Sequence, residues 1–194
     1  MVKSIGSSEI ETAVFISGNG SNLKNLISFS LSKKNPLKIR YIVSSNSNAK
    51  GLSFAKKFKI KKKVYSFKNK KVSENQILYD LKKNRIKFIC LAGFMKILSK
   101  NFINKFNGKI VNIHPSLLPK YKGLDTHRRA IFNKEKYSGC TVHFVSSKLD
   151  SGKILLQKKV RISKNDTPRS LAKKILKQEH IIYPRALKKI FASL

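Results

Sequence analysis

The chain has 194 residues, enough for one domain with a single buried core and too few for two. Its 43 lysines and arginines outnumber 9 aspartates and glutamates, which gives a formal net charge of +34. No stretch approaches the roughly 18 consecutive apolar residues of a membrane helix, and the N-terminal sequence lacks the apolar core of a signal peptide. We therefore expect a cytoplasmic protein without a membrane partner.

The positive charge predicts attraction to polyanions, including nucleic acid and phosphorylated small molecules. The lysines occur in nearly every segment, and the sequence has no helix-turn-helix signature or zinc-finger spacing. Nonspecific attraction of RNA at low salt is therefore expected. Whether the lysine excess serves a function or reflects compositional drift stays open, as does the choice between a monomer and a homodimer.

The first half of the chain alternates short apolar runs with helical patterns. A tight Gly-Asn-Gly turn follows the first run and leads into a helix with Leu23, Leu26 and Ile27 on one face. Ser73 and Gln76 resemble a capping box that begins a helix ending at Asn84. The other elements expected in this half are strands at 12–17, 39–43, 63–67 and 88–92 and a helix at 49–58.

The second half adds strands at 109–113, 141–145 and 154–162 and a short helix at 126–132. Thr167 and Pro168 form an N-cap and first-turn pair for a long final helix with Leu171, Ile175 and Leu176 on one face. Strands that recur between helices predict an α/β fold, with a mostly parallel twisted sheet flanked by helices on both faces. We expect a polar extension at 1–11 and a single domain at 12–194.

Residues 111–121, VNIHPSLLPKY, carry the strongest site signal. Asn112 and His114 are two apart on a strand, so they point to the same side near its carboxyl end, where open α/β sheets bind ligands. The two prolines prevent the following residues from extending the strand. Asp150 offers a matching acid further along the chain. Together these residues favour a chemical role over a lone structural histidine.

The turn at Gly18 and Gly20 precedes a helix start, where free N–H groups and the helix dipole favour an anion. A phosphate monoester fits this site, although the glycines alone would also fit a plain turn. A dinucleotide site needs a third glycine and an acidic residue about twenty positions later, and neither is present.

Cys90 and Cys140 are isolated in apolar, strand-like runs without metal-ligand spacing. We expect both to be buried free thiols rather than a disulfide or a zinc site.

Four strings make the chain resemble the phosphoribosylglycinamide (glycinamide ribonucleotide) formyltransferase family, the folate-dependent, single-domain enzymes of purine synthesis. They are SGNGSNL at 17–23, LAGFMKILS at 91–99 followed by NIHPSLLPKY, VHFVSSKLDSG at 142–152 and QEHIIYP at 178–184. The resemblance runs from about Ala13 to the last helix. It implies a Rossmann-like formyltransferase fold.

The resemblance implies transfer of the formyl group of 10-formyltetrahydrofolate to the amino group of 5-phosphoribosylglycinamide, without a metal. It assigns the family's catalytic residues to Asn112, His114 and Asp150. Asn112 and protonated His114 would donate to the developing oxyanion, with Asp150 stabilising the charged imidazole. Which residue moves which proton stays open.

The resemblance also implies two sets of ligand contacts. For the ribonucleotide they are Asn19, Gly20, Ser21, Asn22, Leu23 and Glu179. For the folate they are Met95, Lys96, Ile97, Leu98, Asn112, Ser146, Ser147, Lys148, Leu149 and Asp150. The family's basic residue toward the folate tail falls near Lys70 or Lys71.

Two positions depart from the family's pattern, since Asp125 stands where His is common and Lys122 where Pro is common. The conformation of their loop therefore stays open. His127 and His143 are expected to be structural.

Three alternatives remain. The first is formyltetrahydrofolate hydrolase, which shares the Asn, His and Asp set but whose family carries an extra N-terminal domain. The second is methionyl-tRNA formyltransferase, which carries an extra C-terminal domain. The third is a noncatalytic basic RNA-binding module, which would explain the charge but leave the NIHPSLLPKY and KLDSG segments without a role.

Overall fold

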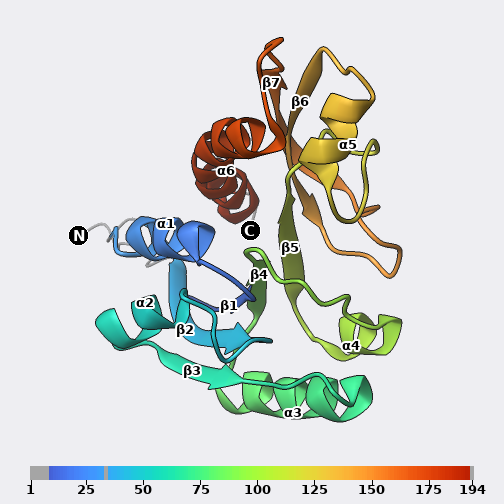
Figure 1. The fold of residues 1–194 in the computed structure, drawn as a ribbon. Helices are drawn as coiled ribbons and strands as arrows, with labels where there is room; N and C mark the ends of the chain where they lie inside the picture. Colours follow the sequence, from blue (N-terminus) through green and yellow to red (C-terminus); the bar gives the residue numbers. More distant parts are fainter. Residues whose placement is uncertain (1–8, 33–34, 193–194) are drawn as a thin grey trace, which may run out of the picture.

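A computed structural model of the chain describes residues 9–32 and 35–192. It contains one sheet of seven strands in the order β3-β2-β1-β4-β5-β6-β7 (Figure 1). The strands are β1 (Ile10–Ile16), β2 (Leu37–Ser44), β3 (Lys61–Val64), β4 (Phe88–Leu91), β5 (Lys109–His114), β6 (Tyr137–Phe144) and β7 (Ile154–Arg161). The helices are α1 (Ser21–Ser30), α2 (Leu52–Lys57), α3 (Lys70–Lys83), α4 (Lys100–Lys105), α5 (Thr126–Phe132) and α6 (Pro168–Phe191).

The first five strands of the chain are parallel, while β6 pairs antiparallel with β5 and β7 antiparallel with β6. The mostly parallel α/β sheet predicted from the sequence is confirmed. Consecutive residues of β1 alternate between two cores, with Val14 and Ile16 on one face and Ala13 and Phe15 on the other. Helices α1 and α6 cover the first face, and α3 and α4 cover the second (Figure 1).

Several predicted boundaries were wrong by a few residues. Strand β1 begins at Ile10, two residues early, and α2 is shorter than the predicted helix at 49–58. Strand β3 occupies Lys61–Val64 instead of 63–67; all four of its residues are exposed at the edge of the sheet, so they show no burial pattern. Strand β6 begins at Tyr137 because its first four residues pair with β7.

The predicted capping box at Ser73 and Gln76 was wrong. Helix α3 begins at Lys70, and the Asn69 side chain accepts a hydrogen bond from Val72 N at 3.1 Å. Ser73 is buried within the helix. The local Ser-x-x-Gln pattern was therefore overridden by an N-cap four residues earlier.

Helix α4 was missed because its six residues show too little periodicity. Its N-cap is Ser99, whose Oγ accepts from Phe102 N at 3.0 Å. The buried carboxylate of Glu74 accepts from Ser99 N at 2.8 Å and from Ser99 Oγ. This contact fixes the end of the 92–98 loop against α3.

The capped final helix is confirmed, with reciprocal hydrogen bonds between Thr167 and Ser170. Leu171 and Ile175 are fully buried, whereas Leu176 is half-buried. The Tyr183 hydroxyl lies 3.0 Å from the carbonyl oxygens of both Leu91 and Val111, so α6 is tied to β4 and β5. These contacts hold the strand ends that carry the site.

Cys90 and Cys140 are buried free thiols, as predicted. Burial raises the pKa of each to about 12. None of the helices in residues 9–32 and 35–192 has the length and hydrophobicity needed to cross a bilayer.

Asp166 generates a prediction about stability. Its carboxylate accepts from Lys174 Nζ at 2.6 Å, Ser170 Oγ at 2.6 Å and Ser163 N at 2.8 Å. These bonds, that of Lys174 foremost, lower the pKa of Asp166 from 3.8 to about 2. A carboxyl with a depressed folded-state pKa stabilises the fold above the unfolded value, and the effect is lost as the pH falls from 3.8 toward 2.

We expect Asp166→Asn to lower the Tm at pH 7 by roughly 2–4 °C, for a loss of about 1 kcal/mol, and to change it little at pH 2. Thermal unfolding followed by circular dichroism over this pH range measures the effect. Exposed Asp125→Asn controls for the change in net charge. An equal loss from Asp166→Asn at both pH values would contradict the assignment.

Candidate active site

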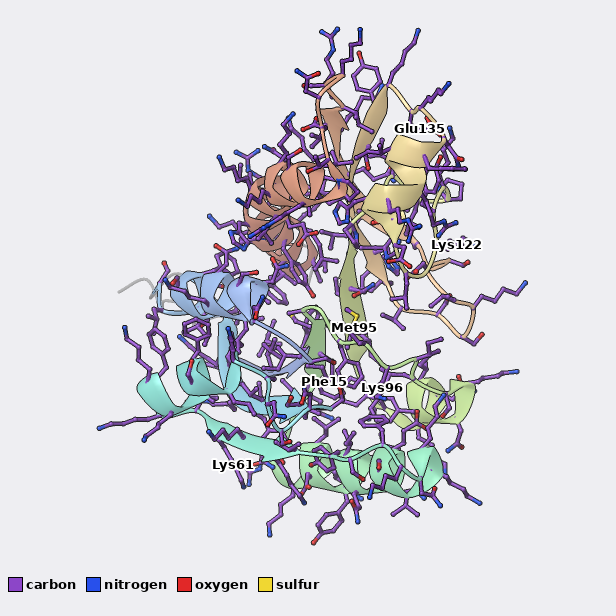
Figure 2. The ribbon with its side chains drawn as sticks, in the orientation of Figure 1. Phe15, Lys61, Met95, Lys96, Lys122 and Glu135 are labelled. Carbon is purple, nitrogen blue, oxygen red and sulfur yellow. The ribbon has the colours of Figure 1, made fainter. Side chains whose placement is uncertain are left out.

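A pocket of about 620 Å³ lies at the carboxyl ends of β4 and β5, where ligand sites occur in open α/β sheets. Strand β5 contributes Asn112 and His114 to it. Its other walls come from the segments at 93–98, 123–127 and 145–150 and from one face of α6. Met95, which lines this pocket, is seen beside β5 in Figure 2.

His114 is buried and both of its ring nitrogens face acceptors. Nδ1 lies 3.4 Å from Asp150 Oδ2, and Nε2 lies 2.9 Å from the Tyr121 carbonyl oxygen. Since a carbonyl oxygen only accepts, Nε2 carries a proton in this arrangement. Nδ1 faces the Asp150 carboxylate, so each ring nitrogen lies beside one acceptor.

Asp150 lies where three segments meet, and its side chain is 8% exposed. Oδ2 also accepts from Gly123 N at 2.9 Å, and Oδ1 lies 3.7 Å from His143 Nε2. The residue has a φ of 45°, a conformation that L-residues seldom adopt. The loop at 121–125 is thereby attached to the end of β5 through one carboxylate.

Asn112 and His143 face each other across the antiparallel pair of β5 and β6. Asn112 Nδ2 lies 3.2 Å from His143 Nε2, and His143 Nδ1 lies 2.8 Å from the Phe144 carbonyl oxygen. Burial lowers the pKa of His143, partly offset by the Phe144 hydrogen bond and by Asp150. His143 was expected to be structural, yet it lines the pocket and contacts a candidate catalytic side chain.

His127, also expected to be structural, lines the same pocket from α5. Its buried Nε2 has no hydrogen-bond partner among the described residues. Burial, with repulsion from His114, lowers the pKa of His127. No sequence pattern distinguished His127 and His143 from core histidines, because their positions in the pocket depend on how β6 and α5 pack.

A second pocket adjoins the first and is formed by the turn before α1. Asn22, Gly93 and Met95 line both pockets. Gly20 is the N-cap of α1 in a left-handed conformation with φ 74°, and without a side chain it makes no side-chain cap. The helix start is thus open to a ligand, in keeping with an anion site.

Glu179 of α6 accepts from Asn22 Nδ2 at 2.7 Å, where both side chains are buried. Burial raises the pKa of Glu179, and the Asn22 hydrogen bond partly offsets the rise. Asn22 Oδ1 is buried without a partner in the described part of the chain. This pair links the helix start to α6 at the junction of the two pockets.

Most residues expected to contact ligands line one of the two pockets. Asn19, Gly20, Ser21 and Asn22 line the smaller one, and Glu179 lines the larger. All of the expected folate residues line the larger one: Met95, Lys96, Ile97, Leu98, Asn112, Ser146, Ser147, Lys148, Leu149 and Asp150. Leu23 is fully buried in the core, and Lys70 and Lys71 are exposed at the start of α3 and line neither pocket.

The departures from the family's pattern lie in the loop before α5. Asp125 adopts a left-handed conformation with φ 55° and lines the larger pocket. Lys122 is exposed and its ammonium group donates to Ser151 Oγ. Arg129 Nη1 donates to the carbonyls of Lys122 and Leu124 at 2.7 and 3.2 Å, so the loop is attached to α5.

The sequence profile of a family described as formyl transferase matches residues 10–187, which is most of the chain. The chain therefore belongs to the formyl transferase family.

Solved structures and curated relatives narrow the assignment. A phosphoribosylglycinamide formyltransferase of Brucella melitensis superposes with a TM-score of 0.89 at 40% identity, covering 96% of this chain and 98% of that one. The phosphoribosylglycinamide formyltransferase of Haemophilus influenzae is 42% identical over 91% of this chain and 84% of its own length. These relatives place the chain among the phosphoribosylglycinamide formyltransferases.

Longer relatives also match. The human trifunctional purine biosynthetic protein adenosine-3 is 40% identical over 90% of this chain, which spans 18% of that protein. The corresponding protein of Chironomus tentans is 42% identical over 90% of this chain, which spans 13% of it.

Gly20 generates a prediction about the turn before α1. A Cβ at this position would lie 2.5 Å from the Cα of Gly51, and the φ of +74° is unfavourable for any L-residue. We expect Gly20→Ala to destabilise the protein by more than about 1 kcal/mol. Urea unfolding measures the loss.

The matched control is Gly18→Ala, because a Cβ at Gly18 would meet nothing within 4 Å. This variant should unfold within about 0.5 kcal/mol of the parent. Equal stability of the two variants would show that the close approach of the two turns is not a constraint.

Proposed function

We propose that the protein transfers the formyl group of 10-formyltetrahydrofolate to the amino group of 5-phosphoribosylglycinamide, a step of purine (IMP) biosynthesis. The observation that carries the proposal is the convergence of Asn112, His114 and Asp150 in one pocket that joins a glycine-rich helix start. The named relatives support the same reaction.

Formyl transfer requires the amine nitrogen to attack the formyl carbon, which forms a C–N bond and leaves a tetrahedral oxyanion. Donors placed in advance stabilise such an oxyanion in a site with little water. The Asn112 amide and the His114 imidazolium supply these donors. In the reaction the oxyanion would replace the Tyr121 carbonyl oxygen as the acceptor of the His114 Nε2–H.

Two protons must move before the bond to the folate nitrogen breaks, one leaving the amine and one reaching the folate nitrogen. The Asp150 carboxylate is the basic group beside His114, at 3.4 Å from its Nδ1. It stabilises the imidazolium and offers an acceptor for the amine proton, directly or through water.

Each substrate has a matching part of the site. The phosphate would bind at Asn19, Gly20, Ser21, Asn22 and the backbone of Leu23, with the ribose at Glu179. The pterin would occupy the slot between the 95–98 and 146–150 segments, where Met95, Ile97, Leu98 and Leu149 supply apolar surface for a flat ring. In this arrangement the two substrates meet at Asn112 and His114.

Turnover of 10-formyltetrahydrofolate by the purified protein, with and without 5-phosphoribosylglycinamide, tests the proposal. Tetrahydrofolate is followed by absorbance and the formylated ribonucleotide by mass spectrometry. Product that forms only with the ribonucleotide establishes the transferase. Formate released without it would indicate the hydrolase alternative, and salt-dependent RNA binding without turnover the noncatalytic one.

We expect Asp150→Asn to lose most of its turnover, by about 100-fold or more, while still binding the ribonucleotide. The asparagine keeps an acceptor for Gly123 N but removes the charge facing His114. Steady-state kinetics and calorimetric titration with the ribonucleotide measure the two quantities. Near-normal turnover would remove Asp150 from the mechanism.

The charge of +34 supports a further proposal, that the surface field assists the capture of both anionic substrates and attracts nucleic acid nonspecifically. Figure 2 shows long side chains with nitrogen tips extending from every part of the molecule in this view. Salt screens such a field over about 10 Å at 0.1 M.

We expect the KM of both substrates to rise several-fold between about 20 mM and 200 mM salt, with kcat nearly constant. Steady-state assays at constant pH measure this dependence, with an uncharged crowding agent in place of salt as the control. A KM that salt leaves unchanged would contradict the proposed role of the charge.

A further inference from the structure

The orientation of the Asn112 carboxamide decides what this side chain offers to the pocket. Its oxygen accepts hydrogen bonds and its nitrogen donates them, and the two ends are similar in size. Stabilising an oxyanion requires the nitrogen end. Some neighbouring group must therefore hold the amide in that orientation.

The neighbour is His143, the residue directly opposite Asn112 in the pairing of β5 and β6. His143 Nδ1 lies 2.8 Å from the Phe144 carbonyl oxygen, which only accepts, so Nδ1 carries a proton. The His143 side chain is 2% exposed, and burial disfavours a charged imidazole. In the neutral ring with a proton on Nδ1, Nε2 is an acceptor.

Asn112 Nδ2 lies 3.2 Å from this Nε2. Because Nε2 accepts, the amide nitrogen must be the group that faces it, and it donates one of its two hydrogens. The second hydrogen remains for a ligand in the pocket that Asn112 lines. Asp150 Oδ1 lies 3.7 Å from the same Nε2.

We propose that His143 is a positioning residue that holds the Asn112 carboxamide with its nitrogen end at the reaction centre, ready to donate to the oxyanion. This inference rests on the proposed formyl transfer. Protonation of His143 or a change of its tautomer would place a donor at Nε2 and favour the opposite orientation of the amide. The Phe144 carbonyl prevents the tautomer change.

The first test is a double-mutant cycle with His143→Leu and Asn112→Ala, which separates a residue acting through its partner from one acting on its own. We expect His143→Leu to lower kcat by about tenfold, with the KM of both substrates within about twofold, as for loss of one oriented hydrogen bond. In the Asn112→Ala background, single-turnover assays should show that His143→Leu lowers the rate of formyl transfer little further. An equal reduction in both backgrounds would overturn the proposal.

Two variants sharpen the cycle. His143→Gln can present an amide oxygen toward Asn112, and we expect it to recover part of the kcat lost in His143→Leu. His180→Leu removes a half-buried imidazole of α6 that lies outside both pockets, and should leave kcat unchanged. A His143→Gln variant that folds and is no more active than His143→Leu would count against an acceptor role.

A second measurement is independent of turnover. Nitrogen-15 NMR of histidine-labelled protein at pH 7.5 reads the tautomer of His143, assigned by its loss in His143→Gln. We expect a protonated Nδ1 and an unprotonated Nε2, with Asn112→Ala shifting the Nε2 resonance. A protonated Nε2 would overturn the proposal, with the nearby carboxylate of Asp150 explaining the proton.

Failure of the proposed function would be distinguishable from failure of the positioning role. Wild-type protein without formyl transfer but with the expected His143 tautomer would refute the reaction and leave the Asn112 contact intact. Wild-type protein with normal transfer and the opposite tautomer would refute the positioning role alone.

Discussion

The buried carboxylate of Asp150 is the constraint on which the site depends. Removing a carboxylate from water is costly unless charged or hydrogen-bonding groups surround it. Here those groups come from separate segments, with Gly123 N at 2.9 Å and His114 Nδ1 at 3.4 Å. Satisfying this one charge therefore brings together the end of β5, the loop after β6 and the loop before α5.

The fold was largely predictable because its signals are local. Apolar runs at β1, β4 and β5 are buried, and the Thr167 cap defines the start of α6. Two errors arose at helix starts, where α3 begins at the cap Asn69 and α4 at the cap Ser99. Glu74 of α3 also accepts a hydrogen bond from Ser99 N, a contact between distant segments that the local sequence does not show.

The candidate site was predictable to the extent that it follows strand ends. Asn112 and His114 lie at the end of a parallel strand, so their place in the pocket follows from topology. Asp150 was picked out as a matching acid, and the resemblance to a known family supplied its catalytic role and the residue Glu179. His143 could not be identified from the sequence, because its proposed role depends on the antiparallel register with Asn112 and on the contact of its Nδ1 with the Phe144 carbonyl.

Most of the few acidic residues are held in specific contacts. The chain has 9 of them against 43 basic residues, and few are left as free surface charges. Glu11, Asp80, Glu135 and Asp166 form ion pairs within 2.9 Å, while Glu74, Asp150 and Glu179 are held in buried or nearly buried contacts. Lys63, Lys120 and Lys174 partner three of these carboxylates, and most other lysines of residues 9–32 and 35–192 lie at exposed positions. In the proposed function the excess charge assists the approach of anionic substrates, whereas the few buried carboxylates determine the geometry of the site.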